Sequence, residues 1–244
     1  MVFDPGGRSN TGPEREQMRD LTEFMKVLGV TYNDQSLLDT ALTHRSYLNE
    51  NKDVKEHNER LEFLGDAVLE LVVTEYLYKN YPNPEGELTN WRSALVKTET
   101  ISDVSRDLGV ENYLLMSRGE AKSFGRSRQL LLANAFEAIS GSIYLDQGYS
   151  AASDFITRNV LCKLDYIIKE RLYIDPKSEF QELAQEKEGV TPRYEVISEE
   201  GPDHNKKFLV GVFLGDTKWG EGTGSSKQSA QQAAAVAAVK KFKK

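Results

Sequence analysis

The chain has 244 residues, 39% of them hydrophobic, with one cysteine and a formal net charge of −7 at pH 7. This composition can supply the cores of one large domain or two smaller ones, and it excludes an internal disulfide framework. No apolar run approaches the roughly 20 residues of a membrane span, and Met1 to Pro13 lack the apolar stretch of a signal peptide. We therefore expect a soluble, cytoplasmic protein that does not bind membranes, with a disordered tail at residues 1–15.

Residues 16–171 are predicted to form an all-α domain, because apolar residues recur there at helical spacing and few stretches alternate as strands do. Breaks between helices are predicted at Pro82, Pro84, Gly86, Gly109 and Gly148 and in the loop 119–125. Cys162 lies in an apolar-periodic segment, where a buried thiol is expected.

An acidic motif lies at Glu59, Glu62 and Asp66. On a helix with 3.6 residues per turn these carboxylates fall within roughly 60° of one another. Such a triplet is often only a solvated helix face, but this helix is apolar around nearly its whole circumference, at Leu61, Phe63, Leu64, Val68, Leu69, Leu71 and Val72. We expect the helix to be largely buried, and buried carboxylates need a cation or hydrogen-bond donors beside them.

The loop 119–128 carries Lys122, Arg126 and Arg128 among glycines and serines. A flexible cationic loop can adapt to a phosphate backbone, so this loop is a candidate phosphate contact. The chain has no glycine-rich loop with a lysine that would cradle the phosphates of a nucleotide, so we expect no nucleotide cofactor.

A second set of oxygen ligands is predicted on the apolar helix at residues 130–139, where Asn134 and Glu137 are three residues apart. Two helices can then direct oxygen atoms at one point. Oxygen ligands with no Cys or His nearby select Mg²⁺ or Mn²⁺ over zinc. Such ions suit phosphoryl chemistry, because they activate water and stabilise the leaving oxygen.

Residues 172–176 are predicted to be a linker, and residues 177–244 a small α+β domain. Asp175 and Pro176 open an amphipathic helix. Three strand-like stretches follow, near Tyr194, from Phe208 to Leu214 and at Trp219, and an Ala-rich helix ends the chain. This order is α-β-β-β-α. Residues 173–244 hold 11 acidic and 11 basic side chains, so the excess negative charge belongs to the first domain.

The segment 59–66, together with residues 41–47, 119–123 and 133–138, resembles the ribonuclease III family. The resemblance runs from about residue 20 to the end of the chain. It implies an endoribonuclease that hydrolyses double-stranded RNA with Mg²⁺, or Mn²⁺ as a substitute, and leaves 5′-phosphate and 3′-hydroxyl ends. Processing of ribosomal and messenger RNA is the implied role.

The resemblance also implies the site residues. Glu62, Asp66, Asn134 and Glu137 would be metal ligands, with Asp66 and Glu137 catalytic and Glu59 in a secondary catalytic role near the scissile strand. Asn134 stands where most bacterial relatives carry Asp, and its carbonyl oxygen can still coordinate Mg²⁺. The sequence leaves open whether this residue is natural or an inactivating substitution.

The α-β-β-β-α region resembles a double-stranded RNA-binding domain, a module that reads the shape of A-form RNA. The resemblance implies RNA contacts by Gln181, Glu182, His204, Ser226 and Lys227. Gln228 occupies a position where the family usually has a second lysine. Each of these residues alone would be an ordinary surface residue.

Three further roles are implied by the resemblance. Phe63, which alone would be a typical core aromatic, would insert into a partner subunit and make a homodimer. Arg45 would contact RNA, although a cap or core pair with His44 is an equal alternative, and Lys122 would contact RNA as well. The main alternative function is a non-cleaving structural or ribosome-associated binder of double-stranded RNA, which rests on Asn134. A DNA-directed nuclease is disfavoured.

Overall fold

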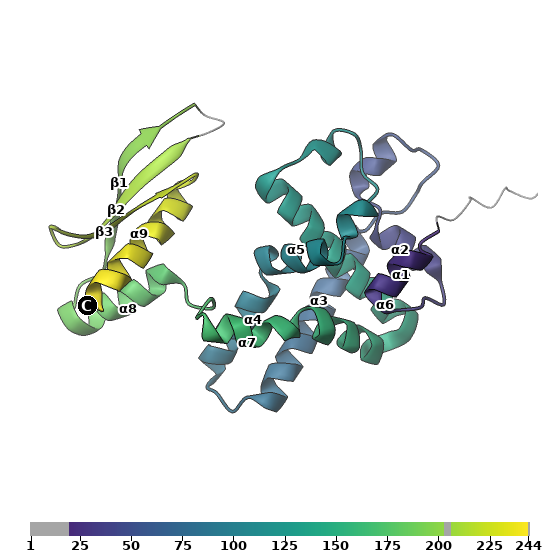
Figure 1. The fold of residues 1–244 in the computed structure, drawn as a ribbon, viewed down its shortest axis with the longest axis horizontal. Helices are drawn as coiled ribbons and strands as arrows, with labels where there is room; N and C mark the ends of the chain where they lie inside the picture. The colour runs from purple at the N-terminus through teal and green to yellow at the C-terminus, as the bar shows by residue number, and fades with distance from the viewer. Residues whose placement is uncertain (1–19, 203–205, 244) are drawn as a thin grey trace, which may run out of the picture. The chain divides into compact units, whose positions relative to one another are not determined.

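The computed structural model describes residues 20–202 and 206–243 (Figure 1). The predicted tail at residues 1–15 and the predicted RNA contact His204 lie outside the described residues. The chain divides into two compact units, of which the first ends at Asp165 and the second begins at Tyr166. The predicted domain limits, with a linker at residues 172–176, remain a prediction.

The first unit is helical, as predicted. Its α-helices are α1 (Thr22–Leu28), α2 (Gln35–Ala41), α3 (Glu59–Asn80), α4 (Glu85–Val96), α5 (Thr98–Asp107) and α6 (Gly125–Asn159), with 3-10 turns η1 (Arg45–Asn49), η2 (Val110–Asn112), η3 (Glu120–Lys122) and η4 (Leu161–Lys163). The short helix α7 (Leu164–Lys169) spans the division between the units. No helix of the described residues is long and apolar enough to cross a membrane.

The helix breaks follow from local backbone chemistry. Proline at position 84 precedes α4 and lies outside the helix, where its missing N–H costs nothing. Gly109 adopts a left-handed conformation, with φ of 68°, directly after Leu108, the C-cap of α5. Within α6, Gly148 has φ of 82° and ψ of −173°, so the helix kinks there.

The core of the first unit lies between α3 and α6, which contact each other more extensively than any other two helices of the described residues. Leu69 on α3 and Phe136, Ile139 and Ile143 on α6 are fully buried. The ring of Phe136 stacks on that of Phe155 with centroids 5.3 Å apart, which ties the two arms of the kinked helix together.

Two burial predictions were wrong. The helix α3 is buried only on the face toward its neighbours, so Phe63 is 83% exposed and Leu71 is 56% exposed. Its apolar circumference is wider than the face that its neighbours cover. Cys162 is also exposed, because the η4 turn directs Leu161 and Leu164 inward and leaves the thiol on the outside.

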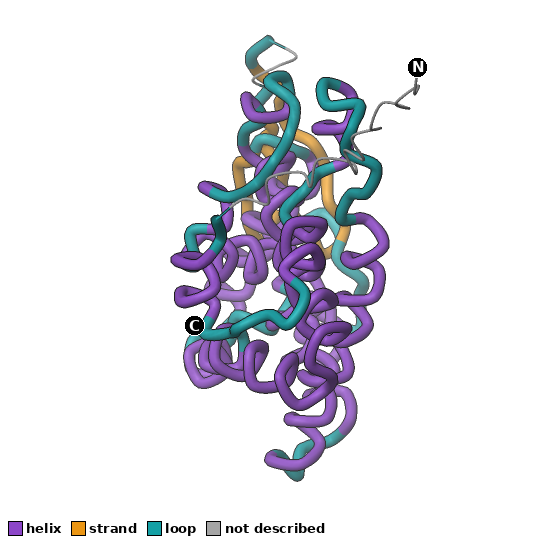
Figure 2. Tube along the Cα trace, turned by 90° about the vertical axis from the view of Figure 1, so that its right-hand side faces the viewer, coloured by secondary structure: helices purple, strands orange, loops and turns teal. Residues whose placement is uncertain are grey.

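The second unit has the predicted order α-β-β-β-α, and the strands of the described residues are confined to it (Figure 2). Its elements are α8 (Pro176–Glu188), β1 (Arg193–Glu200), β2 (Lys207–Leu214), β3 (Thr217–Gly224) and α9 (Lys227–Phe242). The sheet is antiparallel in the order β1-β2-β3. Its core joins Phe180 of α8, Val210 and Val212 of β2, and Ala234 and Ala238 of α9.

Candidate metal centre and RNA-binding residues

The backbones of α3 and α6 touch where Gly65 faces Gly141. A Cβ added at Gly65 would lie 1.7 Å from the carbonyl oxygen of Glu137, and one added at Gly141 would lie 2.3 Å from that of Leu61. Only glycine permits this approach. Sequence reasoning missed both residues, although an isolated glycine within a helical pattern signals a packing reason of this kind.

This close crossing assembles the candidate site, because the polar residues flank the two glycines. Glu62 and Asp66 come from α3, and Asn134 and Glu137 come from α6. The amide of Asn134 hydrogen-bonds to the carboxylate of Glu62, and the charge of Asp66 acts on both Glu62 and Glu137. The structure therefore brings together the four residues that were predicted as metal ligands. Their role as ligands stays a prediction.

The electrostatics of the cluster are unfavourable for three bare carboxylates. Burial, followed by the charges of Asp66 and Glu62, raises the pKa of Glu137 to about 8. Burial and then the charge of Glu59 raise the pKa of Glu62, while the hydrogen bond from Asn134 opposes this rise. A divalent cation would offset the repulsion that contributes to the raised pKa of Glu62 and of Glu137.

The residues fit a hard cation in their chemistry, since every donor is a carboxylate or amide oxygen. Among the described residues, however, no three His, Cys, Asp or Glu side chains already stand in an arrangement that could hold a metal ion. Carboxylates repel one another and stay apart when no cation lies between them, so metal binding would have to draw them together.

Glu59 lies beside the cluster and is partly neutralised. Its carboxylate pairs with Arg45 at 3.2 Å and lies 3.9 Å from Nδ1 of His57. Arg45 begins the η1 turn, whose N-cap is His44. The Arg45 guanidinium is thus bonded to an acidic residue, and its predicted contact with RNA remains a prediction.

The loop that carries the predicted cationic contacts is fixed to the segment before α3. The backbone N–H of His44 donates to the carbonyl of Leu115 at 2.8 Å, and that of Ser117 donates to Oγ of Ser46 at 3.0 Å. Lys122 is exposed at the end of η3, whereas Arg126 and Arg128, which were predicted to lie in a loop, belong to the first turn of α6. Arg128 is less available, because it pairs with Glu111 at 3.4 Å.

In the second unit, the predicted RNA contacts lie on α8 and at the start of α9. Gln181 and Glu182 are exposed and line a shallow hollow of about 400 Å³. The hydroxyl of Ser226 accepts a hydrogen bond from the N–H of Ser229 and caps α9. Lys227 is exposed, but its Nζ lies 3.0 Å from a carboxylate oxygen of Glu199 on β1. Nothing in the local sequence marks Glu199, because this contact joins distant segments.

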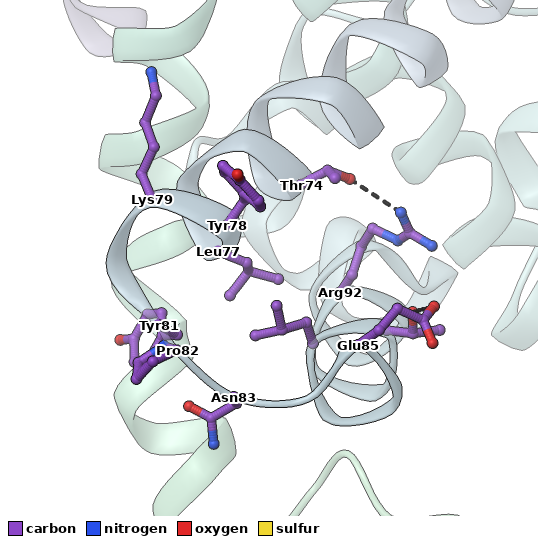
Figure 3. A pocket seen from close by; sticks show the side chains of 11 residues that line it. Thr74, Leu77, Tyr78, Lys79, Tyr81, Pro82, Asn83, Glu85 and Arg92 are labelled. Atoms are coloured by element: carbon purple, nitrogen blue, oxygen red, sulfur yellow. Dashed lines mark hydrogen bonds between the residues drawn. The ribbon is translucent and has the colours of Figure 1, made fainter.

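Pockets among the described residues of the first unit include two that lie against α3. One, of about 860 Å³, lies beside the exposed Phe63 and is lined by Leu37, His57, Leu61, Leu64 and Leu145 among others. The other, of about 760 Å³, lies between the end of α3 and α4 (Figure 3). Figure 3 shows Arg92 at its wall, where the guanidinium donates to Thr74 at 3.1 Å.

Comparisons with known proteins match both units. A family model described as ribonuclease-III-like matches residues 34–164, and one described as double-stranded RNA binding motif matches residues 176–242. The chain is 44% identical to ribonuclease 3 of Protochlamydia amoebophila, over 93% of this chain and 94% of that protein. It is 40% identical to ribonuclease 3 of Borreliella afzelii, over 92% of each chain.

Solved structures of the nuclease domain of ribonuclease III from Campylobacter jejuni resemble the first unit. One is 35% identical with a TM-score of 0.53 and covers 60% of this chain and 97% of that domain. Another is 36% identical with a TM-score of 0.51, covers 57% and 98% respectively, and is described as flexible in a region involved in dimer formation.

Proposed function

We propose that this chain, which belongs to the ribonuclease III family and is a double-strand-specific endoribonuclease, cuts RNA at the cluster of Glu62, Asp66, Asn134 and Glu137. Members of this family use divalent metal ions, and Mg²⁺ is the ion that we propose for this chain, with Mn²⁺ as a substitute. The observation that carries the assignment is the glycine crossing of α3 and α6, which gathers four oxygen-bearing side chains.

The cluster supplies the negative charge and the oxygen atoms that such an ion requires. When bound, a divalent ion activates water and stabilises the leaving oxygen. Glu62, Asp66 and Glu137 would hold it as carboxylates, and Glu137, whose pKa is about 8 without the ion, would give up its proton on binding. The carbonyl oxygen of Asn134 can occupy the fourth position.

The products follow from the direction of attack. An oxygen of water bonds to the scissile phosphorus, the bond from phosphorus to the 3′ oxygen breaks, and that oxygen takes a proton. The fragments carry a 5′-phosphate and a 3′-hydroxyl. Glu59, which pairs with Arg45 and whose charge acts on Glu62, would orient water near the scissile strand.

The second unit binds double-stranded RNA through its double-stranded RNA-binding motif. Its contacts are assigned to Gln181, Glu182, Ser226 and Lys227, of which all four are exposed. A phosphate that reaches Lys227 has to share this ammonium group with Glu199. Processing of ribosomal and messenger RNA in the cytoplasm is the setting that fits such an enzyme.

The alternative function, a non-cleaving binder of double-stranded RNA, has one specific observation in its favour, the amide at Asn134. The direct test is cleavage of an end-labelled RNA duplex of about two helical turns with Mg²⁺ and then with Mn²⁺. Fragments with 5′-phosphate ends support the nuclease. Tight binding without any cleavage in either metal would favour the alternative.

We infer that two copies of the chain form a homodimer through Phe63. This side chain is 83% exposed beside a pocket of about 860 Å³ that is lined by its own neighbours. In a two-fold interface each copy offers the same surface, so the ring of one copy can enter the pocket of the other. This pairing would place two cutting sites in one particle.

Phe63→Ala is therefore expected to weaken the dimer at least about 30-fold, the loss typical of a central interface aromatic. Analytical ultracentrifugation of the full chain measures the dissociation constant. Val27→Ala serves as a control, because Val27 is a 54% exposed apolar residue on α1 that does not line this pocket. A dimer of unchanged affinity in the Phe63 variant would remove Phe63 from the interface.

A further inference from the structure

Phe124 is the most exposed of the large hydrophobic side chains in the part of the chain that the structure describes, at 84%. It is the residue directly before α6, and it is followed by Gly125, whose φ of 55° turns the chain into the helix. A single exposed apolar ring is common on protein surfaces, so the inference depends on the residues that surround this one.

The surroundings of Phe124 are cationic. Arg118, Lys122 and Arg126 are all exposed, and none of them forms an ion pair with a described residue. Several other arginines of this unit are neutralised by acidic partners, as the pairs Arg45–Glu59, Arg92–Glu70 and Arg128–Glu111 show. The first unit has a negative net charge, yet these three unpaired cationic side chains lie within nine residues of one another. Such a group of positive charges can bind a polyanion.

The segment before Phe124 is held in place by hydrogen bonds to other parts of the first unit. Leu115 exchanges backbone hydrogen bonds with the segment before η1, donating to the carbonyl of Leu42 at 2.8 Å. The N–H of Arg118 donates to the carboxylate of Glu50 at 3.2 Å. On its other side, Phe124 leads into α6, where Asn134 and Glu137 follow 10 and 13 residues later. At 1.5 Å per residue, the ring lies roughly 15–20 Å along the helix from these residues.

We propose that Phe124 is a substrate-binding residue that packs its ring against the riboses of the RNA minor groove, while Arg118, Lys122 and Arg126 hold the phosphates beside it. The minor groove of A-form RNA is wide and shallow and displays its sugars, whereas the major groove is too deep and narrow for side chains to read. This contact rests on the proposed function, which places the RNA over the α3–α6 cluster.

An apolar contact and a phosphate contact differ in their dependence on salt. A phosphate contact releases counterions, so its loss lowers the slope of log affinity against log salt concentration by about one. Packing of a ring against sugars releases no ions. Phe124→Ala is therefore expected to raise KM about tenfold, in keeping with the burial of one Phe ring, with an unchanged salt slope. Arg126→Ala is expected to lower the slope.

The experiment measures KM and kcat for cleavage of a labelled RNA duplex by the full chain at several KCl concentrations. Phe124→Trp is expected to retain the wild-type KM, because it keeps an aromatic ring, and Val27→Ala is the matched control for loss of an exposed apolar group. The proposal is supported if KM rises in Phe124→Ala but not in Phe124→Trp or Val27→Ala. The kcat of Phe124→Ala should change less than about twofold, because the contact is made equally in the bound state and in the transition state.

Three results would overturn the proposal. The first is an unchanged KM in Phe124→Ala, and the second is a change in salt slope in Phe124→Ala as large as that in Arg126→Ala. The third is a rise in KM that accompanies weaker self-association of Phe124→Ala in the ultracentrifuge, which would mean that Phe124 contacts protein. Failure of the proposed function is recognised separately, because the unaltered chain would then not cut the duplex at all.

Discussion

Glu137→Gln is expected to abolish cleavage of duplex RNA, with a fall in kcat of at least about 100-fold. The substitution keeps the shape of the side chain but removes its charge, and it leaves Glu62 and Asp66 as the only carboxylates of the cluster. Loss of an outer-shell partner alone typically costs 10–100-fold in metal affinity or activity, so loss of a ligand should cost at least as much. Single-turnover cleavage at saturating Mg²⁺ measures the effect.

The same variant should bind RNA as the unaltered chain does, because the contacts assigned to RNA are made by other residues, of which Arg126 is the one on the same helix. Asp154→Asn is the matched control, since it removes the charge of an exposed acidic residue on the same helix. Cleavage by Glu137→Gln at the wild-type rate would show that α6 does not supply a catalytic carboxylate.

The pKa of Glu137 adds a control for folding. Burial and its acidic neighbours raise the pKa to about 8, so the fold prefers the neutral acid. Its stabilising contribution is complete below the ordinary pKa of 4.5 and is lost as the pH rises through about 8. In EDTA, the unaltered chain should therefore lose more of its Tm between pH 6 and pH 9 than Glu137→Gln does. If Glu137→Gln loses activity while its Tm is not lowered, the loss of activity cannot come from unfolding.

Gly65→Ala is expected to destabilise the first unit strongly. Its new Cβ would lie 1.7 Å from the carbonyl oxygen of Glu137, so α3 and α6 must move apart. Overpacking of a core typically costs about 1–3 kcal/mol and occasionally more, and backbone atoms that cannot rotate away place this case at the upper end. For a unit of this size, about 3 kcal/mol corresponds to a fall in Tm of roughly 6–12 °C. Scanning calorimetry of the full chain measures it.

Gly86→Ala, in the same unit, is expected not to lower the stability of the protein. A Cβ at Gly86 meets nothing within 4 Å, and this residue lies in α4, where Ala is favoured over Gly by about 1 kcal/mol. The Tm should stay level or rise. Equal behaviour of the two variants would contradict the close crossing. Reduced metal binding in Gly65→Ala, beyond the loss of stability, would link the crossing to the site.

The residue types and spacings of this chain were sufficient to predict much of its organisation. The helical period, the breaks at Pro84 and Gly109 and the α-β-β-β-α order all reflect local backbone chemistry, which depends on neighbours in the sequence. The candidate cluster could be predicted too, because Glu62 and Asp66 share a helix face and Asn134 and Glu137 share another. The resemblance to a family supplied the reason to join the two faces.

Features that depend on tertiary contact could not be read in this way. The exposure of Phe63 and Cys162 depends on which helix face a neighbour covers, and a helical pattern does not reveal that. The pairing of Lys227 with Glu199 joins segments that are far apart in the sequence. The approach of Gly65 to Gly141 requires two helices to be placed against each other.

Calorimetric titration of Mn²⁺ into the metal-free full chain tests the assignment of the metal site most directly. We expect Glu137→Gln to weaken Mn²⁺ binding at least about tenfold, Asn134→Asp to strengthen it by adding a charged oxygen, and Asp154→Asn to leave it unchanged. Equal affinity in the unaltered chain, Glu137→Gln and Asn134→Asp would contradict this assignment, because the ion would then bind somewhere other than the crossing of α3 and α6.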